Sequence, residues 1–269
     1  MKKKILAIAD THTGHIFGLN PPSLWVDSSF KKVYKMQKEF YEWYINTINR
    51  IGRVDILIVN GDCIDGKGRK NEGRELREQR MIEQAYAAAE LFKPIKAKHK
   101  IMVEGTPYHS TAGADLFETI TAKEIGSYPL RGKRFVNISG TDINIKLRHK
   151  IGRSALFHGK HTALARAKLD NILEYRKGTE PDCQILLFAH VHYSRMSCDL
   201  SKNWWYAMTL PALQIKSEYG QRECDGDGIT IGVTLITIDT SKHGANQVSF
   251  EIIECPLDII NIDNEILSI

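Results

Sequence analysis

The chain lacks the features that would place it at once in several protein classes. Its 269 residues contain no apolar run of about 18 residues, so no membrane span is expected. Its five cysteines include no CxxC pair, which excludes a zinc ribbon or a disulfide framework and fits a reducing, cytoplasmic setting. Because there is also no internal repeat, low-complexity segment or long linker, we expect one domain over residues 1–269.

The charge of the chain is weakly basic. The formal net charge of +5 is compatible with a polyanionic substrate but does not identify one. Basic residues gather between Lys67 and Arg80, where Glu72, Glu75 and Glu78 interleave with them. This pattern fits a salt-bridged helix face and a phosphate-binding segment equally well. Residues 66–70 lack the Walker spacing, which excludes a nucleotide-triphosphate P-loop.

Short apolar runs alternate with helical patterns over the first two thirds of the chain. The runs are continuous rather than alternating, as in strands that are buried on both faces. This order predicts an α/β fold with largely parallel strands. The predicted strands are Ile5–Ala9, Val54–Val59, Lys100–Val103, Ser154–Phe157 and Gln184–Phe188. The predicted helices are 30–51, 72–92 (stopped by Pro94), 114–125 and 163–175.

The pattern changes after about residue 195. Residues 204–213, 229–239 and 248–255 alternate and are rich in β-forming residues, with no strong helix between them. We therefore expect residues 195–269 to be mainly β, with antiparallel strands that form a second sheet packed on the first. The tail from Pro256 to Ile269 is apolar and acidic, and its role stays open.

Aspartate or histidine follows every one of the five predicted strands. Because the carboxyl ends of strands in an open α/β sheet meet at one edge, these side chains are expected to converge. Asp and His are natural oxygen and nitrogen ligands for zinc, manganese or iron. Each cluster alone is weak evidence, and the case depends on the five together. The clusters are Asp10-Thr11-His12, Gly61-Asp62-Cys63-Ile64-Asp65, Gly105-Thr106-Pro107-Tyr108-His109, His158-Gly159 and His190-Val191-His192.

These motifs resemble those of the calcineurin-like metallophosphoesterases, whose pattern is D-x-H, G-D-x-x-D, G-N-H-D/E, a lone H and G-H-x-H. The resemblance runs from Asp10 to His192, about two thirds of the chain. Ala189 replaces the glycine before His190. In the third motif Thr106 stands in place of the asparagine ligand, and the histidine moves two residues on, to His109. This form is similar to G-T-x-x-H variants of phage and prophage proteins.

The resemblance implies a four-layer α-β-β-α sandwich of two mixed β-sheets flanked by helices, and it implies a role for each residue. Asp62 would bridge two divalent metal ions, and His109 would neutralise the phosphoryl oxygen or protonate the leaving group. Asn60 and Asp65 would orient the ligands. The first metal would be held by Asp10, His12 and His192, and the second by His158 and His190 with Thr106 nearby.

The implied activity is hydrolysis of phosphodiester bonds. Two cations about 3.5–4 Å apart would clamp the phosphate and lower the pKa of a bridging water, so that a metal-bound hydroxide attacks phosphorus. DNA or RNA is the expected substrate class, and manganese the first choice of metal, with iron, zinc, nickel and cobalt open. A phosphomonoesterase, a cyclic-nucleotide phosphodiesterase and a non-catalytic nucleic-acid- or protein-binding relative stay open as alternatives.

Several other residues are candidates for contact with the substrate. Lys67 and Arg69 lie beside the second motif, where they would contact a nucleic-acid backbone. His161 is a weaker candidate for contact with substrate phosphate. The aromatic loop at 14–29 is read first as a local hydrophobic plug and 204–206 first as a core strand, with base stacking as the alternative for both. His99 and His149 are expected on the surface.

Overall fold

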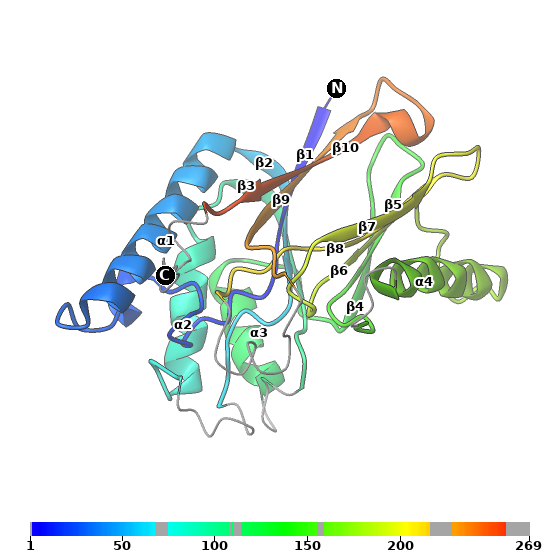
Figure 1. Cartoon of the computed structure of the whole chain (residues 1–269). Helices are drawn as coiled ribbons and strands as arrows, with labels where there is room; N and C mark the ends of the chain where they lie inside the picture. Colours follow the sequence, from blue (N-terminus) through cyan, green and yellow to red (C-terminus); the bar gives the residue numbers. More distant parts are fainter. Residues whose placement is uncertain are drawn as a thin grey trace, which may run out of the picture.

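Two five-stranded sheets pack face to face at the centre of the molecule (Figure 1). The computed structural model describes residues 2–67, 75–107, 109, 114–154, 159–215 and 228–256, except for the side chains of 114–116. The first sheet has the order β10-β9-β1-β2-β3, and the second β4-β5-β6-β8-β7. The strands of the first sheet are β1 (Lys2–Ile8), β2 (Val54–Asn60), β3 (Ala97–Val103), β9 (Gly232–Asp239) and β10 (Val248–Glu254). Those of the second are β4 (Lys133–Asn137), β5 (Asn144–Arg148), β6 (Ile185–Phe188), β7 (Arg195–Asp199) and β8 (Trp205–Thr209).

Helices cover the outer face of each sheet (Figure 1). The first sheet carries α1 (Lys31–Ile51), α2 (Met81–Phe92) and α3 (Ala114–Glu124), and the second carries α4 (Gly159–Arg176). Two short 3-10 helices, η1 (Pro22–Leu24) and η2 (Gly244–Gln247), lie in the connections. In the described part of the chain, no helix is both long and apolar enough to cross a membrane.

Strand alternation explains how both sheets are buried on both faces. In β1, Ile5 and Ala7 pack between the sheets, whereas Leu6 and Ile8 pack against the helices of the first layer. In β6, Leu187 faces the first sheet and Leu186 faces α4. A strand that is apolar at every position therefore joins two cores. The predicted α-β-β-α sandwich is confirmed.

Parallel strands bring their carboxyl ends to one end of each sheet. In the first sheet β1, β2 and β3 are parallel, and in the second β5, β6 and β8 are parallel. The antiparallel partners are β9 and β10 in the first sheet and β4 and β7 at the edges of the second. The loops that follow β1, β2, β3, β5 and β6 therefore start from this end of the sandwich.

The prediction that the C-terminal strands form a second sheet of their own is wrong. The strands β9 and β10 extend the first sheet through β1, and β8 joins the second sheet parallel to β6. β1 is buried on both faces and also needs hydrogen-bond partners on both of its edges, which β2 and β9 provide. The alternating pattern predicted strands correctly but not their partners.

Two local predictions are wrong in the described residues. Residues 75–80 are not helical, because the chain there pairs with the loop after β1: Gly14 O accepts hydrogen bonds from Arg77 N and Glu78 N, and Ile16 N donates to Glu75 O. Ser154, the first residue of a predicted strand, is not in a strand, and residues 155–157 lie outside the described part. The strand that enters the second sheet in this region is β5 instead.

A buried ion-pair network joins α4 to the second sheet. The carboxylate of Glu180 accepts hydrogen bonds from Lys133 Nζ at 2.5 Å, Lys146 Nζ at 2.6 Å and Asn171 Nδ2 at 3.1 Å. Lys146 and Glu180 are buried and Asn171 is fully enclosed. Burial alone would raise the pKa of Glu180, but Lys133 and Lys146 lower it to about 2. The network thus stabilises the charged carboxylate.

We expect Glu180→Gln to lower the free energy of unfolding by about 3 kcal/mol at pH 7, because it leaves the buried Lys146 ammonium without its counter-ion. The folded pKa of about 2 lies below the ordinary value of 4.5, so this stabilisation is present above pH 4.5 and is lost as the pH falls towards 2. Urea unfolding of both proteins at several pH values measures it. The control Glu174→Gln removes the exposed ion pair with Lys177 and should change little. Equal stability of wild type and Glu180→Gln at pH 7 would contradict the prediction.

Candidate metal centre

Five strands deliver polar side chains to one end of the sandwich. Asp10 and His12 follow β1, Asp62 follows β2, and Thr106 and His109 follow β3. In the second sheet, His149 follows β5, and His190 and His192 follow β6. These side chains form contacts across the gap between the two sheets. The structure therefore brings together residues that are up to 182 positions apart in the sequence.

The backbone at this centre is strained. Asp10, His12, Asp62, His190 and His192 have φ angles of 51°, 41°, 48°, 75° and 56°. No other non-glycine residue in the described ranges has positive φ. The left-handed region costs an L-residue about 1 to 2 kcal/mol, so surrounding contacts must hold it in place. Backbone strain at five residues whose side chains share one centre indicates a functional constraint on the orientation of these side chains.

Backbone hydrogen bonds between the first two loops hold this conformation. Asp10 N donates to Gly61 O, His12 N to Asp62 O and Thr13 N to Cys63 O, each at 3.1 Å. The two loops therefore continue the β1–β2 pairing past the end of the strands. Asp65 N closes the series by donating to Thr13 O. The spacing between Asp10 and Asp62 is fixed by the backbone rather than by their side chains.

The first group of candidate metal ligands, called the first ligand group below, consists of Asp10, His12 and His192. His12 Nε2 lies 3.3 Å from His192 Nε2, and Asp10 Oδ1 lies 3.5 Å from His192 Nε2 and 3.9 Å from His12 Nε2. Two ring nitrogens and one carboxylate oxygen thus converge on a single point. Imidazole nitrogens that face each other at 3.3 Å repel unless a proton or a cation lies between them.

The second ligand group consists of Asp62, His149 and His190. Asp62 Oδ2 lies 2.9 Å from His149 Nε2 and 4.0 Å from His190 Nδ1. His149 Nε2 also lies 3.8 Å from Asp10 Oδ1, so it connects the two groups. Asp10, Asp62 and His149 are buried, whereas the side chains of His190 and His192 are 33% and 24% exposed. The centre is therefore open to solvent on the side of β6.

The expectation that His149 lies on the surface is wrong. Only 2% of this residue is exposed, and its ring lies between both buried carboxylates. The sequence did contain a signal, because residues 144–148 alternate polar and apolar side chains as a strand does and His149 follows directly. His158, which the resemblance favoured for this position, lies outside the described residues.

The histidine rings are fixed through their second nitrogens. His12 Nδ1 lies 2.9 Å from Asp65 Oδ1, and His149 Nδ1 donates to Asn60 O at 2.7 Å. His109 Nδ1 donates to Asp65 O at 2.9 Å. A donor bond on Nδ1 leaves Nε2 directed at the centre, as in metal sites whose imidazoles are held by carboxylates or carbonyls. Asp65 and Asn60 thus orient three of the rings.

Burial and charge act differently on these rings. Burial lowers the pKa of His12 to about 4, helped by the charge of His109, so this ring is neutral near pH 7. Burial is also the largest single influence on the pKa of His149 and His109 and acts to lower it, but the carboxylates around them together outweigh it: Asp62 and Asp10 for His149, and Asp62 and Asp65 for His109. The pKa of His149 rises to about 10 and that of His109 to about 9. Without metal, protons on these two rings balance the buried carboxylates.

The third motif supports the Asp62 carboxylate directly. Thr106 N donates to Asp62 Oδ1 at 2.6 Å, and Thr106 Oγ1 lies 3.2 and 3.1 Å from the two carboxylate oxygens. A Cβ atom on Gly105 would collide with Asp62 Oδ1, so only glycine fits at this position. The Thr106 hydroxyl therefore orients Asp62, and its role as a metal ligand stays a prediction.

Glu118 of α3 is a buried residue of this centre that the sequence did not reveal. It is 6% exposed, and its carboxylate accepts hydrogen bonds from Gly105 N at 2.8 Å and Cys63 N at 3.1 Å. Burial and the nearby Asp62 raise its pKa. Nothing in a helical pattern distinguishes such a glutamate from a surface one. Glu118 holds together the loops that carry Asp62 and Thr106.

The predicted substrate-contact residues lie outside the two ligand groups. Lys67 is exposed next to Gly66, and Arg69 lies outside the described residues. His161 lies in the first turn of α4, where its Nδ1 donates to Met196 O at 3.0 Å. Trp25 packs edge-on against Tyr34 and Tyr41, as a hydrophobic plug does.

Residues 204–206 were predicted to belong to a core strand, and the structure agrees. Trp205 and Tyr206 lie in β8, and Trp204 and Tyr206 pack against the core between the sheets. A core role, preferred over base stacking, is thus confirmed for this segment.

Comparisons with known proteins find similar solved structures at low sequence identity and no matching family. No family model matches the chain, and no curated protein matches its sequence. Among solved structures, it is similar to a phosphatase from Mycoplasma pneumoniae (9% identity, TM-score 0.44), covering 95% of this chain and 94% of that one. An archaeal phosphodiesterase (12%, 0.43) matches over 94% and 99%. A metallophosphoesterase from Sphaerobacter thermophilus (13%, 0.38) matches over 96% and 91%.

We expect Gly105→Ala to weaken manganese binding at least tenfold, because the added methyl group would displace the Asp62 carboxylate. Isothermal titration calorimetry of the metal-free protein measures the affinity. The control Gly152→Ala places a methyl group in open space and should bind manganese as wild type does. An unchanged affinity for Gly105→Ala would show that the position of Asp62 does not matter for metal binding.

Proposed function

We propose that this protein is a dinuclear metal-dependent phosphoesterase that hydrolyses phosphodiester bonds. The observation that carries the proposal is the pair of adjoining ligand groups, connected by the contacts of His149 with both Asp10 and Asp62. The two groups offer mixed nitrogen and oxygen ligands, which suit manganese, iron, zinc, nickel or cobalt. Manganese is the first metal to test.

The residues fit a pair of cations. Asp10 Oδ1 and His149 Nε2 are buried atoms that form no well-directed hydrogen bond among the described residues, although His149 Nε2 lies 2.9 Å from Asp62 Oδ2 and Asp10 Oδ1 lies 3.5 Å from His192 Nε2. Four carboxylates, those of Asp10, Asp62, Asp65 and Glu118, are buried around the same point. Buried charges of one sign require opposite charge nearby, and two divalent cations would supply it. Bound metals would thus replace the proton on His149, a proposed ligand, as the counter-charge.

Each metal has a proposed set of ligands. Asp10, His12 and His192 would hold the first, and His149 and His190 the second. Asp62 would bridge them, a role that its buried carboxylate between His149, His190 and His109 supports. When bound, the metals would polarise the phosphate and activate a water molecule. Thr106 would hold Asp62 in place, and His158 stays an alternative ligand for the second metal.

His109 is the proposed catalytic residue of the chain itself. Its Nδ1 is held by Asp65 O, its Nε2 lies 3.9 Å from Asp62 Oδ2, and its side chain is 21% exposed. The ring is thus oriented by one nitrogen and open to a substrate at the other. His109 would neutralise a phosphoryl oxygen or protonate the leaving oxygen. Lys67, Arg69 and His161 are proposed contacts to more distant parts of the substrate.

We expect the manganese-loaded protein to hydrolyse bis-p-nitrophenyl phosphate and Asp62→Asn to lower the rate more than roughly hundredfold. Loss of an outer-shell partner costs about 10- to 100-fold, and Asp62 would contact both metals. The matched control is Asp55→Asn in β2, the strand that precedes Asp62, because the Asp55 carboxylate accepts a hydrogen bond from Lys4 N. Full activity of Asp62→Asn would contradict the proposal. A preference for p-nitrophenyl phosphate would favour a phosphomonoesterase, and absence of turnover with metal bound a non-catalytic relative.

We expect His149→Ala to lower the manganese stoichiometry from two ions to one. This ring is a proposed ligand of the second metal and contacts both buried carboxylates. Metal analysis after dialysis measures the stoichiometry without any activity assay. His99→Ala is the control, because His99 stacks on Tyr128 away from both ligand groups. If His158→Ala removed one ion and His149→Ala none, the sequence-based assignment would hold instead.

A further inference from the structure

Four cations lie at the ends of the neighbouring strands β4 and β5, or two residues beyond them, beside the metal centre. Lys133 at the start of β4 pairs with Arg148 at the end of β5 in the antiparallel register. Arg131 and Lys150 lie two residues beyond them, where the same register would place them opposite each other. All four residues are exposed. We name Arg131, Lys133, Arg148 and Lys150 the basic patch.

The charge of this patch is only partly balanced. Lys133 binds Glu180, which Lys146 shares. The Glu104 carboxylate lies beside Gly132, at 3.1 Å from the position of a Cβ there. The side chains of Arg131, Arg148 and Lys150 form no ion pair with any residue that the structure describes. Like charges directly opposite each other on adjacent strands destabilise a sheet. Folding alone therefore gives no reason for this arrangement.

The patch and the metal centre share a strand end. Exposure alternates along this segment, so that Arg148 and Lys150 are exposed while His149 between them is buried against Asp62. On the neighbouring segment, Arg131 O accepts a hydrogen bond from Glu104 N, next to Gly105 and Thr106. The patch therefore lies next to His149 on one segment and close to Thr106 on the other. Residues two apart on a strand are about 7 Å from each other, so the cations form an extended surface rather than a single-anion pocket.

We propose that the basic patch binds the sugar–phosphate backbone of a nucleic-acid strand whose scissile phosphate lies at the metal centre. The inference rests on the proposed function and specifies its substrate. A polyanion with regularly spaced phosphates has the same chemistry at the centre and at the patch, which a small ester or a lone phosphate lacks. Arginine and lysine side chains that form no ion pair in the described part of the chain are suited to such a backbone, because their contacts with phosphates release the counter-ions of the nucleic acid.

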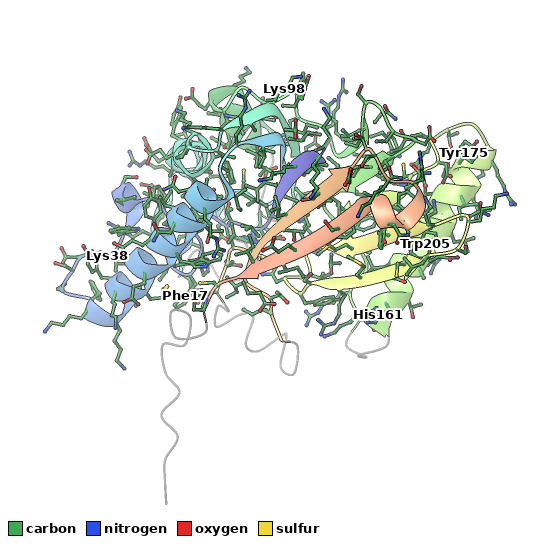
Figure 2. All side chains as sticks on the ribbon, turned by 90° about the horizontal axis from the view of Figure 1, so that it is seen from above. Phe17, Lys38, Lys98, His161, Tyr175 and Trp205 are labelled. Carbon is green, nitrogen blue, oxygen red and sulfur yellow. The ribbon has the colours of Figure 1, made fainter. Side chains whose placement is uncertain are left out.

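The test compares two triple variants that lose equal charge. Arg131→Gln, Arg148→Gln and Lys150→Gln together remove the unpaired cations of the patch. Lys35→Gln, Lys38→Gln and Arg50→Gln together form the control on α1, and Figure 2 shows Lys38 on the side of the molecule away from α4. Fluorescence anisotropy follows a labelled single-stranded oligonucleotide in EDTA over a salt series. EDTA removes the metals and prevents cleavage, so binding alone is measured.

We expect the patch variant to bind the oligonucleotide at least roughly tenfold more weakly at low salt. The slope of log affinity against log salt should become shallower by about 2, since each of three lost contacts contributes about 0.7 for a single strand. The control variant should keep the affinity and slope of wild type. Equal losses in both variants would reduce the effect to net charge and overturn the patch, as would wild-type binding by the patch variant.

The two proposals fail separately. A protein that binds oligonucleotide through the patch but hydrolyses no ester with manganese would refute the enzyme and keep the patch. A protein that hydrolyses bis-p-nitrophenyl phosphate while its patch variant binds oligonucleotide like wild type would refute the patch and keep the enzyme. Circular dichroism of both triple variants checks that each is folded, and single substitutions at Arg148 and Lys150 replace the triple variant if it is not.

Discussion

The centre depends on one constraint, the burial of the Asp10 and Asp62 carboxylates at the junction of two sheets. Each carboxylate needs a positive partner, and the His149 ring contacts both of them, at 3.8 Å from Asp10 Oδ1 and 2.9 Å from Asp62 Oδ2. The strained backbone at five residues of the centre, the glycine at 105 and the hydrogen bonds from Thr106 all serve to hold these oxygens in place. The fold supplies this rigidity because the loops are anchored on strands buried on both faces.

The sequence allowed the layered fold and most of the centre to be predicted, because buried parallel strands leave a strong signal. Ile5–Ala9 and Val54–Val59 are continuous apolar runs, and a polar residue directly after such a run lies at the edge where strands end. Asp10, His12, Asp62, His190 and His192 were found in this way and lie together in the structure. Their side chains converge through left-handed backbone at all five residues, which the sequence does not reveal.

The second sheet shows why other parts were missed. β4 and β5 carry Lys133, Lys146 and Arg148, so neither strand has the continuous apolar run that predicts a buried strand. The more apolar segment at 154–157 was chosen instead, and with it His158 rather than His149. Glu118 could not be recognised at all, since its role depends on two loops that meet only in three dimensions. Long-range contacts, not local propensity, decide such positions.

The end of β5 carries residues of both the metal centre and the basic patch. A strand turns successive side chains to opposite faces, so that one short segment directs His149 at the buried carboxylates and Arg148 and Lys150 at solvent. A shift of the strand by one residue would bury two cations and expose the histidine. The same register that completes the ligand set therefore also sets the position of the patch. Any change that moves β5 should affect both the metal centre and the binding of extended substrates, which a separately folded binding element would not do.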